Sequence, residues 1–116
     1  MSDVTIYHNP RCSKSRQTLQ LLRDNGVEPN VVEYLKTPLD ADGLKGLLKS
    51  LGIGPRDLMR TKEAEYREQG LDDPSLCDDD LIAAIAATPK LMERPVVTKG
   101  AKAAIGRPPE NVLNIL

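Results

Sequence analysis

An apolar, β-branched run at Val4–Tyr7 is followed, after a short break, by leucines that recur at helical spacing. The helical pattern covers Ser13–Asn25 and stops at Gly26, since glycine readily takes the left-handed conformation that ends many helices. A second short apolar run, Val31–Tyr34, comes next. A strand, a helix and a strand in this order form a right-handed crossover between two parallel strands. The pattern therefore predicts the start of an α/β sheet.

The middle of the chain changes to a purely helical pattern, which predicts a helical insert at about residues 37–88. Its first helix carries the leucines from Leu39 to Leu51, with Thr37-Pro38 as the start signal and Gly52 as the stop. The last helix has Asp78 as its expected N-cap. Further helices, bounded by glycine, proline or capping residues, are predicted over Pro55–Met59, Glu63–Gln69 and Asp78–Ala87.

The C-terminal part returns to strand patterns. Arg94–Gly100 predicts a strand with a turn behind it, and Ala101–Ile105 predicts its antiparallel partner. Pro95 stands directly before a buried strand, where a proline is not an ordinary strand residue, so it is a candidate cis-proline. Pro109–Leu116 predicts a closing helix, with its inward face formed by Val112, Leu113 and Leu116.

The predicted order is β-α-β, helical insert, β-β-α, which gives a mixed four-stranded sheet. This order, with a cysteine after the first strand and a proline before the third, resembles the thioredoxin-like fold. We expect residues 1–116 to form a single thioredoxin-like α/β domain.

Cys12 lies where the first strand gives way to the first helix. Unpaired backbone N–H groups and the positive end of the helix dipole favour an anion there. Arg11, Lys14 and Arg16 add positive charge, and His8 lies on the incoming loop. We therefore expect the pKa of Cys12 to fall from about 8.5 into the range of roughly 3.5–7.5 found for activated thiols. The alternative is an inert structural cysteine.

The third position after Cys12 is Ser15, so no second thiol is available there for an internal disulfide. A redox cycle at Cys12 must then use an external thiol. Ser15 either donates a hydrogen bond to the Cys12 thiolate or is an ordinary first-turn residue. Cys77, the second cysteine, lies among aspartates that raise the pKa of a thiol, which predicts a poor nucleophile.

The loop of the tyrosine phosphatases also presents an oxyanion to a cysteine thiolate, but it requires an arginine six positions later. Position 18 is a threonine, so arginines that bind an anion must come from elsewhere in the chain. Arg60, Arg94 and Arg107 each lie near chain-breaking residues, and guanidinium groups match tetrahedral oxyanions in a bidentate way. Arg94 is the strongest candidate because it precedes Pro95. The alternative for each is a solvated arginine.

His8–Arg16 resembles the active-site loop of the glutaredoxin-coupled, glutathione-dependent arsenate reductases of the ArsC/Spx family. The resemblance continues at Leu58–Thr61, Arg94–Val96 and Gly106–Glu110, and it runs essentially from end to end. The chain is most similar to the short subgroup of that family, which keeps the catalytic residues.

The resemblance implies that Cys12 attacks arsenate, and that His8 and Ser15 lower the pKa of its thiol. It also implies that the arginines that hold the oxyanion are Arg60, Arg94 and Arg107. The implied activity is reduction of arsenate to arsenite in arsenic detoxification, with glutathione as co-substrate, glutaredoxin as partner and no bound metal or cofactor. We expect a monomer.

Two other functions fit parts of this pattern. One is a Spx-like regulator that binds RNA polymerase, but such regulators sense redox state through two cysteines, and Ser15 removes the second. The other is a glutathione-linked thiol oxidoreductase with a different substrate.

Composition excludes several further classes. The net charge is -1, so no overall field attracts nucleic acid or anionic lipid. Three tyrosines with no phenylalanine or tryptophan give no stacking platform for nucleic acid. One histidine and two separated cysteines cannot complete a zinc site, and no apolar run is long enough for a membrane span. We expect a cytoplasmic protein in a reducing compartment.

Overall fold

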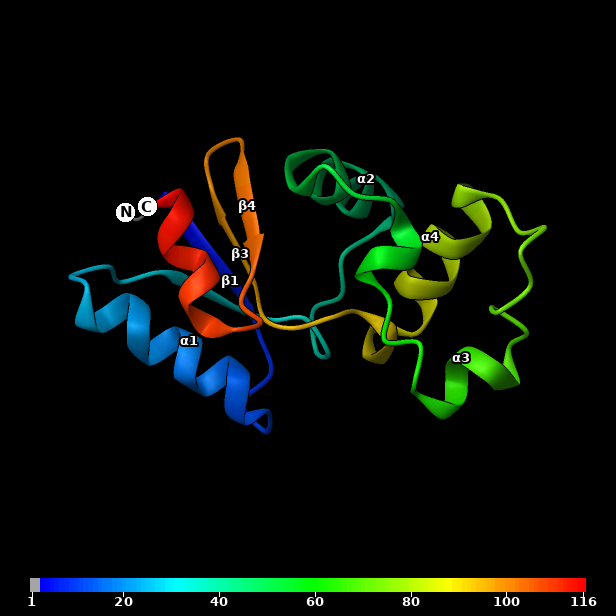
Figure 1. The fold of residues 1–116 in the computed structure, drawn as a ribbon, viewed down its shortest axis with the longest axis horizontal. Helices are drawn as coiled ribbons and strands as arrows, with labels where there is room; N and C mark the ends of the chain where they lie inside the picture. The colour runs from blue at the N-terminus through cyan, green and yellow to red at the C-terminus, as the bar shows by residue number, and fades with distance from the viewer. Residues whose placement is uncertain (1–2) are drawn as a thin grey trace. The chain divides into compact units, whose positions relative to one another are not determined.

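A mixed four-stranded sheet with the strand order β2-β1-β3-β4 organises the first of two compact units (Figure 1). This computed structural model describes residues 3–116. β1 (Val4–His8) pairs in parallel with β2 (Asn30–Glu33) and antiparallel with β3 (Val96–Lys99). β3 in turn pairs antiparallel with β4 (Lys102–Ile105). The predicted α/β class, the parallel crossover and the thioredoxin-like strand arrangement are all confirmed.

The first unit is built from both ends of the chain, the part up to Thr37 and the part from Arg94 onward. Its core is formed by β1, β3, α1 (Ser13–Asp24) and η3 (Pro109–Ile115), where η denotes a 3₁₀ helix. The side chains of this core are all aliphatic: Val4, Ile6, Leu22, Val97, Val112 and Ile115. The core therefore packs α1 against β1 and so limits where the turn between them can lie.

The second unit, Pro38–Glu93, lies in the chain between β2 and β3 and is helical. An isolated antiparallel bridge pairs Met59, in the interior of this segment, with Met92 near its C-terminal end. α4 packs against α2, η1 and η2. The elements of this unit are α2 (Ala41–Leu51), η1 (Pro55–Leu58), α3 (Ala64–Glu68), α4 (Asp78–Ala87) and η2 (Pro89–Leu91).

Two helix starts differ from the prediction because nearby aspartates cap them differently. α2 begins at Ala41 rather than at Thr37-Pro38, since the carboxylate of Asp40 accepts a hydrogen bond from the Gly43 N–H at 2.8 Å. The N-cap of α4 is Cys77 rather than Asp78. There the carboxylate of Asp80 reaches back to the Cys77 N–H at 3.2 Å, as in a capping box.

The closing helix also differs from the prediction. It is a 3₁₀ helix, in which residues three apart share a face. Val112 and Ile115 are therefore buried, whereas Leu113 and Leu116, predicted to face inward from an α-helical period, are exposed. Among the helices of the described residues, none has the length and apolar character that crossing a bilayer requires.

Candidate functional site

Cys12 is the N-cap residue of α1, at the end of a tight turn that follows β1. Its backbone N–H donates to the carbonyl of Asn9 at 3.0 Å, and its own carbonyl accepts from the Arg16 N–H at 3.0 Å. The side chain of Asn9 accepts from the Arg11 N–H at 3.0 Å, which closes the turn locally. The turn thus presents a half-buried sulfur at the start of the helix, as the sequence predicts.

The pKa of Cys12 lies below its ordinary value, although burial, the largest single influence, raises it. The backbone N–H of Ser15, the charge of Arg94 and the backbone N–H of Lys14 each lower this pKa, and a hydrogen bond from the Arg94 side chain adds to them. The sulfur makes no capping hydrogen bond of ordinary geometry, so these N–H groups act on it mainly as dipoles. The environment favours a thiolate.

Arg94 is the cation that acts on Cys12, and two nitrogen atoms of its guanidinium have no hydrogen-bond partner among the described residues. Its Nε and Nη1 are buried without a hydrogen-bond partner among residues 3–116. The Arg94–Pro95 peptide bond is cis, as the position of Pro95 suggested. The guanidinium therefore combines a contact to the thiol with buried donors that an anion would satisfy.

Gly106 lies close to the Arg94–Pro95 segment. The N–H of Gly106 donates to the carbonyl of Pro95 at 2.9 Å. A Cβ at Gly106 would lie 2.9 Å from Cγ of Pro95 and 2.7 Å from Oγ1 of Thr18 on α1. Only glycine fits between the proline ring and the helix here.

His8 and Ser15 form a buried pair beneath this turn. Nδ1 of His8 lies 2.6 Å from Oγ of Ser15, and the same oxygen accepts from the Asn9 N–H at 3.0 Å. Burial lowers the pKa of His8, Glu33 raises it, and Arg16 and Arg23 lower it further. The net direction of the His8 pKa is downward, which favours the neutral imidazole at neutral pH.

The hydroxyl of Ser15 therefore forms hydrogen bonds with His8 and with the backbone of the turn. Ser15 acts on the Cys12 thiol through its backbone N–H instead. The basic residues beside Cys12 in sequence also act differently from the prediction. Arg16 donates from Nη1 to the carbonyl of Pro10 at 2.9 Å, which braces the turn. The charge that lowers the Cys12 pKa comes instead from Arg94, which is far away in sequence.

Arg107 belongs to the same unit as Cys12 and Arg94. It follows Gly106, its peptide bond to Pro108 is cis, and its side chain is exposed. Its carbonyl accepts from Nδ2 of Asn111 at 3.1 Å. The second cis bond was not predicted, although the Arg-Pro sequence is the same as at position 94.

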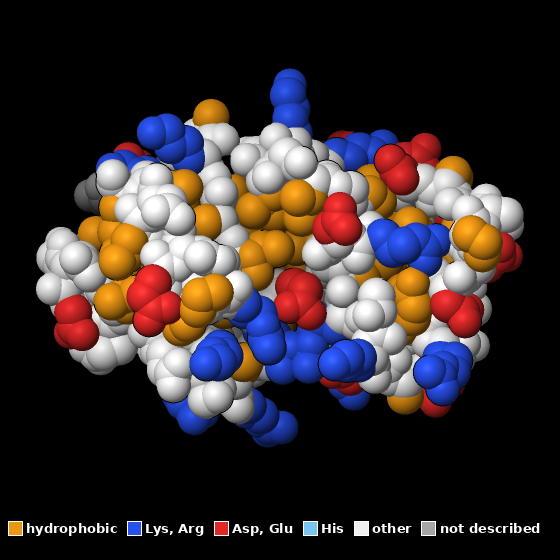
Figure 2. All heavy atoms as spheres, in the orientation of Figure 1, with side chains coloured by type: hydrophobic (Ala, Val, Ile, Leu, Met, Phe, Trp, Pro, Cys, Tyr) orange, Lys and Arg blue, Asp and Glu red, His pale blue; other side chains and the backbone are white. Residues whose placement is uncertain are grey.

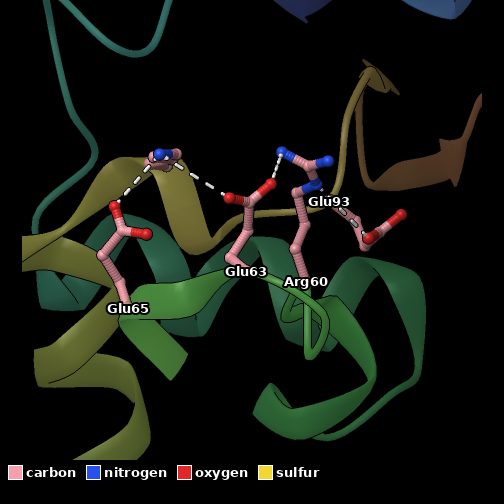
Figure 3. A network of polar contacts seen from close by, with 5 residues as sticks. Arg60, Glu63, Glu65 and Glu93 are labelled. Carbon is pink, nitrogen blue, oxygen red and sulfur yellow. Dashed lines mark ion pairs between the residues drawn. The ribbon is translucent and has the colours of Figure 1, made fainter. Parts of the chain in front are cut away.

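Arg60 belongs to the second unit, where it lies in a network of ion pairs (Figure 3). Its Nη1 pairs with Oε1 of Glu63 at 2.5 Å, and its Nε lies 4.0 Å from Oε1 of Glu93. Lys90 joins Glu63 to Glu65, with distances of 3.6 and 3.1 Å. The Arg60 N–H donates to the carbonyl of Leu91 at 2.6 Å, so both its backbone and its side chain are held.

The other cysteine, Cys77, is exposed, and its thiol donates to Oδ2 of Asp80 at 3.2 Å. Among the described residues, no group of three or more histidine, cysteine, aspartate or glutamate side chains is placed to hold a metal ion. Acidic and basic side chains both occur across the face shown in Figure 2, in keeping with the small net charge.

Comparison with known proteins gives consistent matches. A model of the ArsC family matches residues 7–115. The chain is 60% identical over 114 residues to the protein YfgD of Escherichia coli (strain K12), covering 97% of this chain and 96% of that one. It is 49% identical over 117 residues to a protein of Neisseria meningitidis serogroup A named arsenate reductase, with 100% of both chains covered. The solved structure of an arsenate reductase from Vibrio cholerae matches with a TM-score of 0.96 and 52% identity, covering 97% of each chain. These matches confirm the resemblance and the fold expected from the sequence.

Proposed function

Because the chain belongs to the ArsC family, we propose that it is an arsenate reductase in which the Cys12 thiolate is the nucleophile. The proposal extends to this chain the activity named for its relatives in Neisseria meningitidis and Vibrio cholerae. The geometry around Cys12 supports it independently of those names.

The observation that carries the proposal is the guanidinium of Arg94. It acts on the Cys12 thiol and also has two buried nitrogen atoms, Nε and Nη1, whose N–H groups have no partner among residues 3–116. Buried N–H donors of a cation are costly when unpaired, and a tetrahedral oxyanion supplies the matching acceptors. An oxyanion bound to this fork would lie beside the sulfur that attacks it.

The reaction begins with substitution at arsenic. The Cys12 sulfur forms a bond to As(V), and one arsenate oxygen leaves as water after protonation. The backbone N–H groups of Ser15 and Lys14 and the charge of Arg94 lower the pKa of the Cys12 thiol, which favours the thiolate that attacks. Arg94 then stabilises the negative charge that remains on the arsenate oxygens.

Reduction requires two external thiols because Ser15 occupies the place of a resolving cysteine. In the proposed cycle, the thiol of glutathione replaces a second oxygen on arsenic and releases another water. A glutaredoxin thiolate then attacks the glutathione sulfur, forming a mixed disulfide and leaving the electron pair of the As–S bond on arsenic. Water finally cleaves the bond between Cys12 and As(III), which releases arsenite.

The roles of the remaining residues are part of the same proposal. His8 and Ser15 keep the turn before Cys12 in place through their hydrogen bond. From the family resemblance, Arg60 and Arg107 are further ligands of the oxyanion. We also propose a cytoplasmic location, because two free cysteines and a glutathione-dependent cycle suit a reducing compartment. The monomeric state expected from the sequence is part of the same proposal.

The test is turnover of arsenate with glutathione, glutaredoxin and an NADPH-coupled readout. Cys12→Ser should abolish turnover, and Cys77→Ser, the matched control, should leave it largely unchanged. A comparable loss in both variants would indicate an internal disulfide relay and contradict the proposed use of external thiols. An active wild-type protein without glutathione would contradict the proposed donor.

Arginine variants separate binding of the oxyanion from folding. Loss of one charge-assisted contact costs about 1.5–3 kcal/mol, or roughly tenfold to a hundredfold in kcat/KM. Arg94→Lys should restore little activity, because a point charge lacks the planar fork. Arsenate that protects Cys12 from alkylation equally in wild type and in a folded Arg94→Ala variant would refute the role of Arg94.

A further inference from the structure

A cavity of about 230 Å³ lies in the first unit, beside the turn that leads to Cys12. One wall is the turn itself, with His8, Pro10 and Arg11. The other wall is the end of β2 and the turn after it, with Glu33, Leu35 and Lys36. The mechanism above makes no use of this cavity.

The second wall is held in a fixed shape. The carbonyl of Glu33 accepts hydrogen bonds from the N–H groups of Lys36 and Thr37, both at 2.9 Å. β2 itself is tied to β1 in parallel, with Glu33 opposite His8. The two walls therefore belong to neighbouring strands and form a preformed hollow.

The charges around the hollow are arranged in a specific way. Arg11 and Lys36 are exposed cations of the lining, which also contains Glu33, whose Oε1 lies 3.6 Å from Nζ of Lys36. Pro10 and Leu35 supply apolar surface, and Leu35 remains 45% exposed despite its size. Cations beside an anion, with an apolar contact, complement the end of a small molecule that carries a carboxylate and an ammonium group.

The position relative to Cys12 limits what such a molecule can be. Arg11 directly precedes Cys12, and the carbonyl of Asn9 is bonded to the Cys12 N–H at 3.0 Å. A tripeptide spans up to about 10 Å when extended. A tripeptide with one end in the cavity can therefore place a central thiol beside Cys12.

We propose that this cavity binds the γ-glutamyl end of glutathione, which carries one carboxylate and one ammonium group, and presents the thiol of glutathione to Cys12. The inference rests on the proposed function, in which glutathione is the thiol donor. Arg11 and Lys36 attract the carboxylate, Glu33 receives the ammonium group, and Pro10 and Leu35 contact the aliphatic chain of the γ-glutamyl residue. The cavity is smaller than the pockets of about 300–1,000 Å³ that enclose whole ligands, so the rest of the tripeptide stays outside it.

The test uses S-methylglutathione, which keeps the charges of glutathione but cannot react. His8 lines the cavity and is the single histidine of the sequence, so its ring NMR signals report on occupancy without ambiguity. Titration into the full-length protein should shift these signals and the backbone signals of residues 33–36. The diethyl ester of S-methylglutathione, which lacks both carboxylates, should bind much more weakly.

Charge variants locate the contacts. Arg11→Gln and Lys36→Gln should each weaken binding about two- to fivefold, as expected for exposed charge pairs, and the double variant about tenfold. Lys102→Gln removes the same charge at an exposed position on β4 and should leave binding unchanged. In turnover, the double variant should raise the KM for glutathione and leave the KM for arsenate unchanged.

Each outcome decides the inference. Equal binding of the ester, equal binding by the double variant and Lys102→Gln, or shifts confined to other residues would overturn it. Glutaredoxin that shifts these signals while S-methylglutathione does not would also overturn it. The proposed function is tested separately, by whether arsenate protects Cys12 from alkylation. A protein that binds S-methylglutathione in the cavity but shows no protection by arsenate would contradict the proposed function and leave the cavity assignment intact.

Discussion

Replacing Gly106 with alanine should destabilise the first unit and weaken the activation of Cys12. The added methyl group would lie 2.7 Å from Oγ1 of Thr18 and 2.9 Å from Cγ of Pro95, closer than carbon atoms normally approach these groups. Neither neighbour can retreat easily. Thr18 is fully buried and its hydroxyl donates to the carbonyl of Lys14 at 2.8 Å, while the Pro95 ring is rigid and buried.

The size of the effect follows from overpacking. Inserting a methyl group into a filled core costs typically about 1–3 kcal/mol. With a urea dependence of roughly 1–3 kcal/mol per molar for a small protein, the unfolding midpoint should fall by on the order of 1 M. A displaced Pro95 also moves Arg94, so the pKa of Cys12 should rise toward its ordinary value.

The matched control is Gly46→Ala. Gly46 is an exposed position inside α2, and a Cβ there meets no atom within 4 Å. Alanine favours the helix over glycine by about 0.5–1 kcal/mol, so this variant should be more stable than wild type. Urea unfolding and the pH dependence of Cys12 alkylation measure both effects. A Gly106→Ala variant as stable as wild type, with unchanged alkylation, would refute the packing argument.

Three further outcomes are expected. Alkylation of Cys12 should slow as the pH falls through its lowered pKa. Ionisation of Cys12 should contribute its full stabilisation above about pH 8.5, and this contribution should be lost as the pH falls through the pKa of Cys12 in the folded protein. The unfolding free energy in urea should therefore depend on pH in wild type through this group, and Cys12→Ser should lack that part of the dependence. Ser15→Ala leaves the buried Nδ1 of His8 without its hydroxyl partner and should lower the unfolding free energy by about 1–3 kcal/mol in urea; no loss would show that the pair is dispensable. Asp40→Ala removes the N-cap of α2 and should lower the unfolding free energy by about 1 kcal/mol, as measured by thermal unfolding. Asp40→Asn, which can still cap the helix, should keep most of the wild-type stability.

Much of the fold could be predicted because its long elements have strong periodic patterns. β1 and α1 were predicted within a residue at each end, since the apolar run and Gly26, with φ of 78°, mark them clearly. The short elements were less predictable. η2 was missed and the closing helix was given the wrong period, because a few residues carry too little pattern to separate a 3₁₀ helix from an α-helix.

The site divides in the same way. The helix N-terminus at Cys12 could be predicted locally, and Arg94 could be predicted from Pro95. The partner of the Ser15 hydroxyl could not, because three groups compete for one oxygen and only the folded geometry decides among them. The ion pair between Arg60 and Glu63 could not be predicted either. The two residues are three positions apart, and this spacing predicts a contact only within a helix.

The first unit is formed from two segments that are far apart in the sequence, and this has a consequence during synthesis of the protein. During synthesis β1 emerges early, but its antiparallel partner β3 begins only at Val96, after the whole second unit. Arg94 emerges at the same late stage, so a nascent chain contains Cys12 long before it contains the cation that helps ionise it. The thiol should therefore stay comparatively unreactive on the ribosome. The thiol becomes reactive only after Arg94 has been synthesised and β3 and β4 have completed the sheet. In chains arrested before Arg94, Cys12 should react with alkylating agents at the rate of an ordinary cysteine.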